Sequence, residues 1–183
     1  YIIPLAPGHP PFGALGYVLA ADEIVRQITE RKASIKRIVV ASGSGTTHAG
    51  LLFGFASLGS ELEITGICVR RDEQQQKHRI KNRCQEIAEL LGVDNPVAEE
   101  RIQLTDQFLA PGYGKINAAT LEAIDLCARL EGLLRDPVYT GKSMAGCINI
   151  ARSDDRKDPL LFIHTGGTPG LFGYSKMLAD HLG

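Results

Sequence analysis

The segment from Ser42 to Gly50 has the composition of a site that binds phosphate. It reads Ser-Gly-Ser-Gly-Thr-Thr-His-Ala-Gly and lies between a segment that predicts a strand and one that predicts a helix. Its glycines let the backbone turn tightly and approach an anion closely. The first turn of a helix offers N–H groups without partners and a positive dipole end. With the hydroxyls of Ser44, Thr46 and Thr47, the segment predicts a phosphate site that needs no arginine.

The spacing of this loop separates it from two nucleotide-binding motifs. It lacks the Gly-Lys-Ser/Thr ending of a P-loop, so nucleoside triphosphate chemistry is not expected. Gly43, Gly45 and Gly50 miss the Gly-x-Gly-x-x-Gly spacing, and Arg70 rather than an acidic residue follows the next strand, which argues against a Rossmann dehydrogenase. An alternative interpretation stays open, in which the loop is a polar turn with an ordinary helix cap.

A second candidate segment reads Asp-Pro-Val-Tyr-Thr-Gly-Lys-Ser-Met from Asp136 to Met144. By itself, Tyr139 just after Pro137 is compatible with a half-buried aromatic whose hydroxyl is satisfied. Lys142 is interpreted as a solvated residue at a helix start.

A third candidate segment follows an apolar strand and reads His-Thr-Gly-Gly from His164 to Gly167. A histidine at the end of such a strand is more often packed than catalytic, and His164 is expected to be structural. The glycines Gly166 and Gly167 are also compatible with a tight turn from strand to helix. His48 can be explained as a residue that lines the first turn of its helix.

Strands and helices alternate along the chain. The patterns of apolar residues predict strands at 1–5, 38–41, 64–69, 101–104 and 160–164, and helices at 14–31, 46–58, 72–91, 117–134, 141–151 and 170–182. This alternation predicts a three-layer α/β fold, a mostly parallel sheet with helices on both faces. Ligands of such sheets bind beyond the carboxyl ends of the strands. A site is therefore expected in the turns after residues 41, 69, 104 and 164.

Length and composition fit one α/β domain. The 183 residues carry a formal net charge of −1, with no basic excess that would indicate nucleic acid. No apolar run is long enough for a membrane span and no signal peptide opens the chain, so a cytoplasmic protein is expected. The four cysteines form no Cys-x-x-Cys pair; they predict free thiols and no metal site.

Read together and in this order, the three segments resemble the D-cysteine desulfhydrase and 1-aminocyclopropane-1-carboxylate (ACC) deaminase family. The Gly13–Tyr17 segment is similar to a further family motif, and the resemblance covers essentially the whole chain. These enzymes use pyridoxal 5′-phosphate (PLP) and have the tryptophan-synthase β-like fold, also called fold type II. The resemblance implies that 1–183 is the C-terminal portion of the PLP-binding large domain.

The resemblance also implies roles for individual residues. Tyr139 would lie near the cofactor ring and the substrate as an acid/base or positioning group. The residues that would bind the cofactor are Ser44, Gly45, Thr46 and Thr47 at the phosphate, and Thr140, Thr165 and Gly166 near the pyridine side. A hydroxyl gives the ring nitrogen a weaker partner than a carboxylate does.

Two threonines indicate the branch of the family. The deaminases are expected to have Glu after the tyrosine and Leu at the position of Thr165, whereas this sequence has Thr140 and Thr165. The chain therefore resembles the desulfhydrases, which convert D-cysteine to pyruvate, sulfide and ammonia. ACC deaminase and L-cysteate sulfo-lyase remain alternatives for the small-molecule amino-acid substrate, and the resemblance suggests a homodimer.

The sequence departs from the family in two places. The family's PLP lysine lies in an N-terminal Gly-Gly-Asn-Lys segment, and neither this segment nor the small domain after it occurs here. The chain alone is expected to catalyse elimination poorly, because it would be either a fragment of a longer protein or one of two chains that together form the enzyme. The alternative from another functional class is a phosphate-binding domain without catalysis. The apolar start at Tyr1 also suggests a missing upstream part. The Pro-rich turn at 6–12 replaces a Gly-Gly-Ser-Asn-like turn and puts substrate choice in doubt.

Overall fold

A parallel sheet lies at the centre of the fold. The computed structural model describes residues 9–182 except 154 and 157, so the strand expected at 1–5 lies outside the described residues. The strands are β1 (Arg37–Ser42), β2 (Glu63–Cys68), β3 (Gln103–Thr105) and β4 (Leu160–Phe162). They pair in the order β3-β2-β1-β4, and every pair is parallel. Because all the strands point the same way, their carboxyl ends share one edge.

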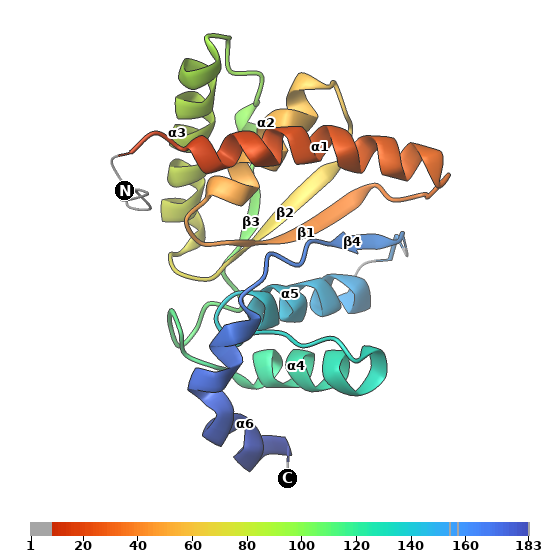
Figure 1. Ribbon diagram of the computed structural model, residues 1–183, viewed down its shortest axis with the longest axis vertical. Helices are drawn as coiled ribbons and strands as arrows, with labels where there is room; N and C mark the ends of the chain where they lie inside the picture. The colour runs from red at the N-terminus through yellow and green to blue at the C-terminus, as the bar shows by residue number, and fades with distance from the viewer. Residues whose placement is uncertain (1–8, 154, 157, 183) are drawn as a thin grey trace.

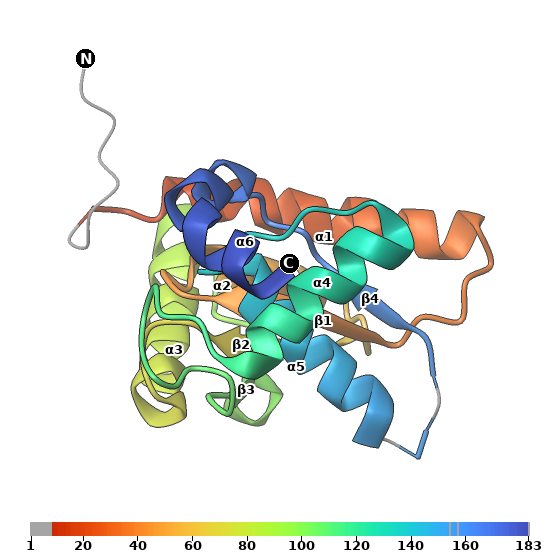
Figure 2. The same cartoon turned by 90° about the horizontal axis from the view of Figure 1, so that it is seen from below.

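Helices cover both faces of the sheet (Figure 1). On one face lie α1 (Phe12–Glu30), α2 (Thr46–Ser57) and α3 (Glu73–Leu91), and on the other lie α4 (Ala118–Glu131) and α5 (Thr140–Ser153). The chain ends in a 3-10 segment, η2 (Thr168–Tyr174), and in α6 (Ser175–Leu182), which passes beside α4 (Figure 2). The prediction of a three-layer α/β fold is confirmed. Among the described residues, no helix has both the length and the apolar character needed to cross a membrane.

The two faces of β1 explain why the sheet needs both helix layers. All six of its residues are buried. Ile38 and Val40 pack into the cluster formed with α1, α2 and α3, whereas Val39 packs into the cluster formed with α5. Alternate side chains of a strand point to opposite faces, so a continuous apolar strand is buried on both. The four cysteines are free and buried, as expected.

The contact between α1 and α2 brings backbone against backbone. A Cβ atom at Gly50 would lie 2.5 Å from the carbonyl oxygen of Ala14, and one at Gly54 would lie 2.5 Å from the Cβ atom of Ala21. Only glycine fits such distances. The close contact fixes the position of α2 over the sheet, and with it the loop that precedes α2.

The structure corrects three element boundaries. Arg101 does not begin a strand; it ends a 3-10 turn, η1 (Glu99–Arg101), and its guanidinium donates to the carbonyl oxygen of Leu62. The helix expected at 117–134 ends at Glu131, because the next residue, Gly132, has a left-handed conformation and caps it. The helix expected at 170–182 begins as the 3-10 segment η2 because Pro169 and two glycines interrupt the α-helical pattern.

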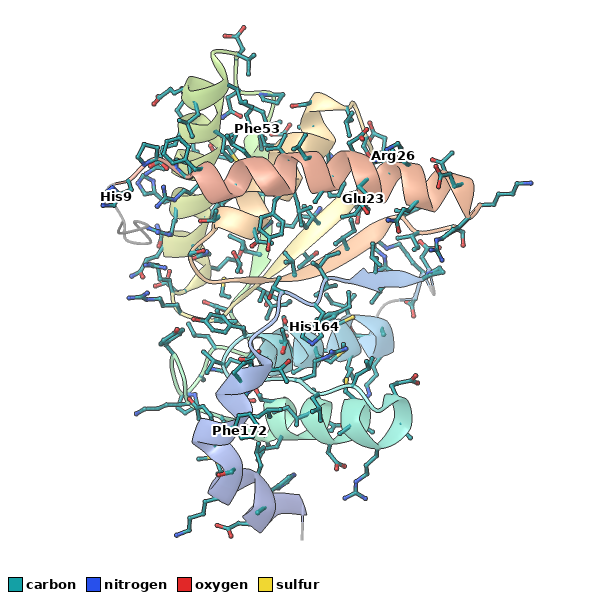
Figure 3. The ribbon with its side chains drawn as sticks, viewed as in Figure 1. His9, Glu23, Arg26, Phe53, His164 and Phe172 are labelled. Atoms are coloured by element: carbon teal, nitrogen blue, oxygen red, sulfur yellow. The ribbon has the colours of Figure 1, made fainter. Side chains whose placement is uncertain are left out.

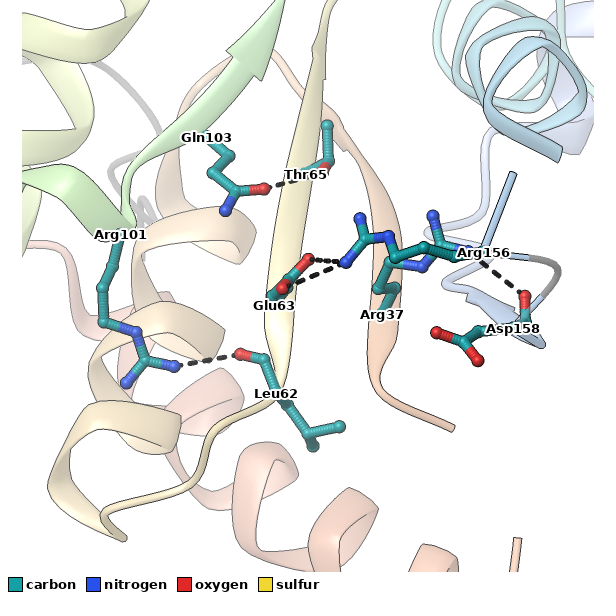
Figure 4. A network of polar contacts seen from close by, with 8 residues as sticks. All are labelled: Arg37, Leu62, Glu63, Thr65, Arg101, Gln103, Arg156 and Asp158. Atoms are coloured by element: carbon teal, nitrogen blue, oxygen red, sulfur yellow. Dashed lines mark hydrogen bonds and ion pairs between the residues drawn. The ribbon is translucent and has the colours of Figure 1, made fainter. Parts of the chain in front are cut away.

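Polar contacts cross the sheet where the strands begin (Figure 4). Arg156 pairs with Glu63 at 3.2 Å, and Arg37 donates to the carbonyl oxygen of Asp158 at 3.3 Å. A cavity of about 580 Å³ opens here between the sheet and α5. Since ligands of parallel sheets bind at the opposite edge, we assign this network to the joining of strands and loops.

Candidate functional site

A second cavity, of about 340 Å³, lies among the loops that follow all four strands. This volume is within the range of small-ligand sites. The residues that line it are Ala41, Gly43, Ser44, Gly45 and Thr47 after or at the end of β1, Arg70 after β2, Tyr113 after β3, Thr165, Gly166 and Gly167 after β4, and Tyr139 before α5. The segments that follow all four strands therefore contribute residues to one cavity.

The loop after β1 leads directly into the N-terminus of α2. Gly45 is the N-cap residue and has φ +87°, a left-handed conformation that favours glycine. No side chain caps this helix, although the amide of Thr46 lies 3.3 Å from the hydroxyl of Ser44. An ordinary Ser or Thr cap is therefore not present. The helix presents its first-turn amides and its positive dipole end beside Ser44 and Thr47.

A buried chain of polar side chains lies beneath this loop. The amide nitrogen of Gln76 donates to the hydroxyl of Ser42 at 2.9 Å, and that hydroxyl lies 3.2 Å from Nδ1 of His48. His48 is fully buried, and a Cβ atom at Gly66 would lie 2.4 Å from its ring. His48 therefore packs against Gly66 of β2. Its role goes beyond lining the first turn of its helix. Burial lowers the pKa of His48 to about 4.

The low pKa of His48 predicts a loss of stability in mild acid. The unfolded chain takes up a proton at this histidine near pH 6.5, whereas the folded chain does so only near pH 4. Stability from this group is complete above pH 6.5 and falls as the pH drops to 4, by about 1.4 kcal/mol per pH unit and about 3 kcal/mol in all. Urea unfolding between pH 8 and pH 4.5 should show this slope. In the variant His48→Gln the slope should be smaller, and an unchanged slope would show that other groups cause it.

Two tyrosines form one wall of the cavity. The hydroxyls of Tyr113 and Tyr139 are hydrogen-bonded, and their rings lie 6.0 Å apart at 70°. The guanidinium of Arg70 lies 5.5 Å from the ring centre of Tyr113. The hydrogen bond with Tyr113, followed by burial, raises the pKa of Tyr139 to about 12. The Tyr139 phenol therefore keeps its proton at neutral pH and can act as a donor.

Asp136 fixes the backbone that carries Tyr139. Its carboxylate is buried and accepts hydrogen bonds from the amides of Val138 (2.9 Å), Tyr139 (2.7 Å) and Thr140 (2.8 Å). The Thr140 hydroxyl donates to the same carboxylate at 2.7 Å. Because this hydroxyl is buried and already engaged, Thr140 supports the site through Asp136 and does not line the cavity.

The loop that carries Tyr113 is held through its carbonyl oxygens. The side chain of Asn117 donates to the carbonyls of residues 108 and 110, and the Tyr174 hydroxyl donates to that of residue 114. Lys142 donates to the carbonyls of residues 109 and 112, at 2.7 Å each. Lys142 is fully buried, so its interpretation as a solvated residue is wrong, and burial lowers its pKa.

The turn after β4 contains two glycines with positive φ and follows His164, which is labelled in Figure 3. Gly166 and Gly167 have φ +95° and +90°, and a Cβ atom at Gly167 would lie 2.6 Å from the Asp136 carboxylate. His164 accepts the amide of Gly166 at Nδ1, and its Nε2 lies 3.2 Å from the carbonyl oxygen of Leu134. His164 is exposed, so the expectation of a packed histidine is wrong; its contacts are with backbone atoms.

The cavity brings together most of the residues that the sequence singled out. Those that line it are Ser44, Gly45, Thr47, Tyr139, Thr165 and Gly166. Thr46 begins α2 beside the cavity and Thr140 lies behind it. Sequence reasoning missed Arg70 and Tyr113. Arg70 directly follows a predicted strand, which was a usable signal, whereas Tyr113 lies in a loop with no motif.

Three comparisons place the chain among known proteins. A family model described as pyridoxal-phosphate dependent enzyme matches residues 2–166. A crystal structure described as an ACC deaminase homologue is 39% identical with a TM-score of 0.82, and the match covers 93% of this chain and 50% of that one. A mutant of O-ureido-L-serine synthase with O-ureido-L-serine bound shares the fold at 14% identity, with a TM-score of 0.58 and the same coverage. The chain thus spans about half the length of these two structures.

Proposed function

We propose, from the premise that this chain belongs to the pyridoxal-phosphate dependent enzymes, that the cavity among the strand ends holds the phosphate and ring of PLP. In this proposal residues 1–183 are the C-terminal portion of the large domain. The chain spans half of its 39%-identical relative, and the proposal assigns the PLP lysine and the small domain to the remainder of the enzyme.

The chemistry of the donors fits the phosphate of PLP. The N-terminus of α2 has no side-chain cap, Gly45 has the left-handed conformation that turns the loop into the helix, and Ser44 and Thr47 add hydroxyls at the same cavity. We assign the phosphate to residues 44–47. Thr165 and Gly166, on the turn after β4, are assigned to the ring side of the cavity, and Thr140 is assigned a supporting role through Asp136.

Tyr139 is the residue of this chain that we assign to proton transfer. When bound, PLP withdraws electrons from the α-carbon of an amino acid, and this permits loss of a β-substituent. Tyr139 is protonated at neutral pH, as an ordinary tyrosine also is, and it can give that proton to a leaving group, although Tyr113 and burial raise its pKa. Tyr113 orients the phenol through their shared hydrogen bond.

The proposed reaction is α,β-elimination on D-cysteine followed by hydrolysis with one water molecule, which together yield pyruvate, sulfide and ammonia. The sequence branch marked by Thr140 and Thr165 supports this substrate over ACC. ACC deaminase and L-cysteate sulfo-lyase are the alternatives within this chemistry, and a phosphate-binding domain without catalysis is the alternative outside it. The same resemblance supports a homodimer. The single observation that carries the proposal is the meeting of the phosphate loop, Tyr139 and Thr165 in one cavity.

Two measurements test this proposal. The first is an absorbance scan of the chain with PLP, before and after borohydride, with intact mass. Saturable binding that phosphate competes for, with no covalent adduct, is expected; an adduct on one lysine would show that the chain contains its own PLP lysine. The second is an assay of the longer enzyme that contains this chain. Pyruvate with sulfide from D-cysteine is expected, whereas sulfite from L-cysteate or 2-oxobutanoate from ACC as the main product would contradict the proposed substrate.

A further inference from the structure

Side chains of α3, and of the turn before it, hold the phosphate loop from outside the cavity. Arg71 Nη1 donates to the carbonyl oxygen of Gly43 at 3.1 Å, and the side-chain amide of Gln76 donates to the same oxygen at 3.2 Å. Arg79 Nε donates to the carbonyl oxygen of Ser44 at 2.6 Å. Two successive carbonyls of the loop are therefore turned toward α3.

The direction of these carbonyls sets the direction of the amides that follow them. The peptide bonds from Gly43 to Ser44 and from Ser44 to Gly45 are trans, so each N–H points away from its C=O. Because the carbonyls face α3, the N–H groups of Ser44 and Gly45 point away from α3. All three residues line the cavity, so these amides are available on the side where a phosphate would lie.

The same helix supports Gly45 by direct packing. A Cβ atom at Gly45 would lie 3.1 Å from the side chain of Ile80 and 3.7 Å from Cγ of Arg79. The aliphatic stem of Arg79 therefore lies against the loop while its guanidinium binds the carbonyl of Ser44. The contacts leave the loop little freedom to turn its amides away.

The arginines behind the loop also concentrate positive charge there. Arg83 pairs with Glu86, but no carboxylate of the described residues is within ion-pair distance of Arg71 or Arg79. Burial lowers the pKa of Arg79, and the charges of Arg71 and Arg83 lower it further. This mutual repulsion is relieved when an anion binds nearby.

We propose that Arg71 and Arg79 are positioning residues for the phosphate of the cofactor. They act through the carbonyls of Gly43 and Ser44, which they hold so that the next two amides face the phosphate, and they place two cations behind the loop. The inference rests on the proposed phosphate site at residues 44–47. It adds two arginines that do not line the cavity and act through backbone carbonyls.

The test compares two probes that differ only in the phosphate. Pyridoxamine 5′-phosphate and pyridoxamine have no aldehyde, so neither forms a covalent bond with a lysine, and fluorescence titration gives both dissociation constants. In the variant Arg79→Met we expect the affinity for pyridoxamine 5′-phosphate to fall about tenfold and that for pyridoxamine to stay the same. Arg71→Met should give a smaller loss, because Gln76 still binds the carbonyl of Gly43.

Two further variants separate charge, geometry and folding. Arg79→Lys keeps the cation with a different donor and should recover part of the loss, most clearly at low salt. Lys81→Met removes a cation from the same helix, at a residue that pairs with Glu99, and should change neither affinity. The phosphorus NMR shift of bound pyridoxamine 5′-phosphate, followed against pH, should show a higher phosphate pKa in Arg79→Met than in the parent chain.

The outcomes distinguish the two proposals. If the parent chain does not prefer pyridoxamine 5′-phosphate over pyridoxamine, the phosphate site itself is wrong. If it does, and Arg79→Met weakens both probes equally or neither, only the positioning role is overturned. A selective loss with an unchanged phosphate pKa supports the geometric part of the role and overturns the electrostatic part.

Discussion

The variant Asp136→Asn is expected to lower the free energy of unfolding by about 3 kcal/mol. It is also expected to lower the pKa of the Tyr139 phenol. The Asp136 carboxylate is 1% exposed and accepts three amides and one hydroxyl, with two of these bonds on each oxygen. An asparagine of the same shape turns an NH₂ group toward two of the donors and removes the charge. Urea unfolding measures the first effect. The second is measured as a fall in the pKa of the Tyr139 phenol, whose ordinary value is near 10.

A matched control keeps this prediction specific. Asp22→Asn makes the same chemical change in an exposed carboxylate that pairs with Arg26 on one face of α1, and it should change stability by less than about 0.5 kcal/mol. If Asp136→Asn is as stable as this control, the buried carboxylate does not organise the start of α5. The role assigned to Tyr139 would then need another support.

The variant Lys142→Met is expected to have the second largest effect, a loss of about 2 to 4 kcal/mol. Methionine fits the apolar path of the lysine chain but removes the charged donor from the carbonyls of Leu109 and Gly112, which keep only their backbone donors, the amides of residues 112 and 115. The loop should then open locally. Hydrogen exchange of residues 109–114 would rise more than that of β1 and β2, and the contact between Tyr113 and Tyr139 would weaken.

The control for this change is Lys115→Met, which removes an exposed lysine from the same loop. It should leave stability and exchange nearly unchanged. If Lys142→Met and Lys115→Met behave alike, the two carbonyl contacts of Lys142 contribute little, and Asn117 with Tyr174 must suffice to hold the loop. A rise in exchange spread over the whole chain would indicate global destabilisation and not a released loop.

Periodicity predicted the elements that have continuous apolar faces. The segments that became β1, β2, α2 and α3 lie within one residue of their expected bounds, because each has a clear apolar pattern, and glycine or a capping residue lies near an end of β1, α2 and α3. The pattern failed where a tertiary contact decides. Arg101 was assigned to a strand, but its guanidinium binds carbonyls before β2 and favours a 3-10 turn.

The site was partly visible in the sequence for a physical reason. Ser44, Gly45 and Thr47 are brought to the cavity by local backbone geometry, which spacing encodes, and the rule about strand ends indicates where Thr165 and Gly166 lie. Tyr113 and Lys142 depend on a contact between a loop and a helix far apart in the chain. Nothing in the local sequence specifies that contact, so Lys142 was interpreted as solvated and Tyr113 was overlooked.

The short pairing of β4 with β1 has a consequence for the order of folding. β1 and β2 are neighbours in the chain and pair over six residues, whereas β4 pairs with β1 over three, from Arg37 with Leu160 to Val39 with Phe162. Closing the long intervening loop is entropically the most expensive step of sheet assembly. The β1–α2–β2 unit carries the loop that we propose binds the phosphate, and Arg71 follows it, so this part of the cavity can form on the nascent chain before the turn with Thr165 and Gly166, which must wait for β4.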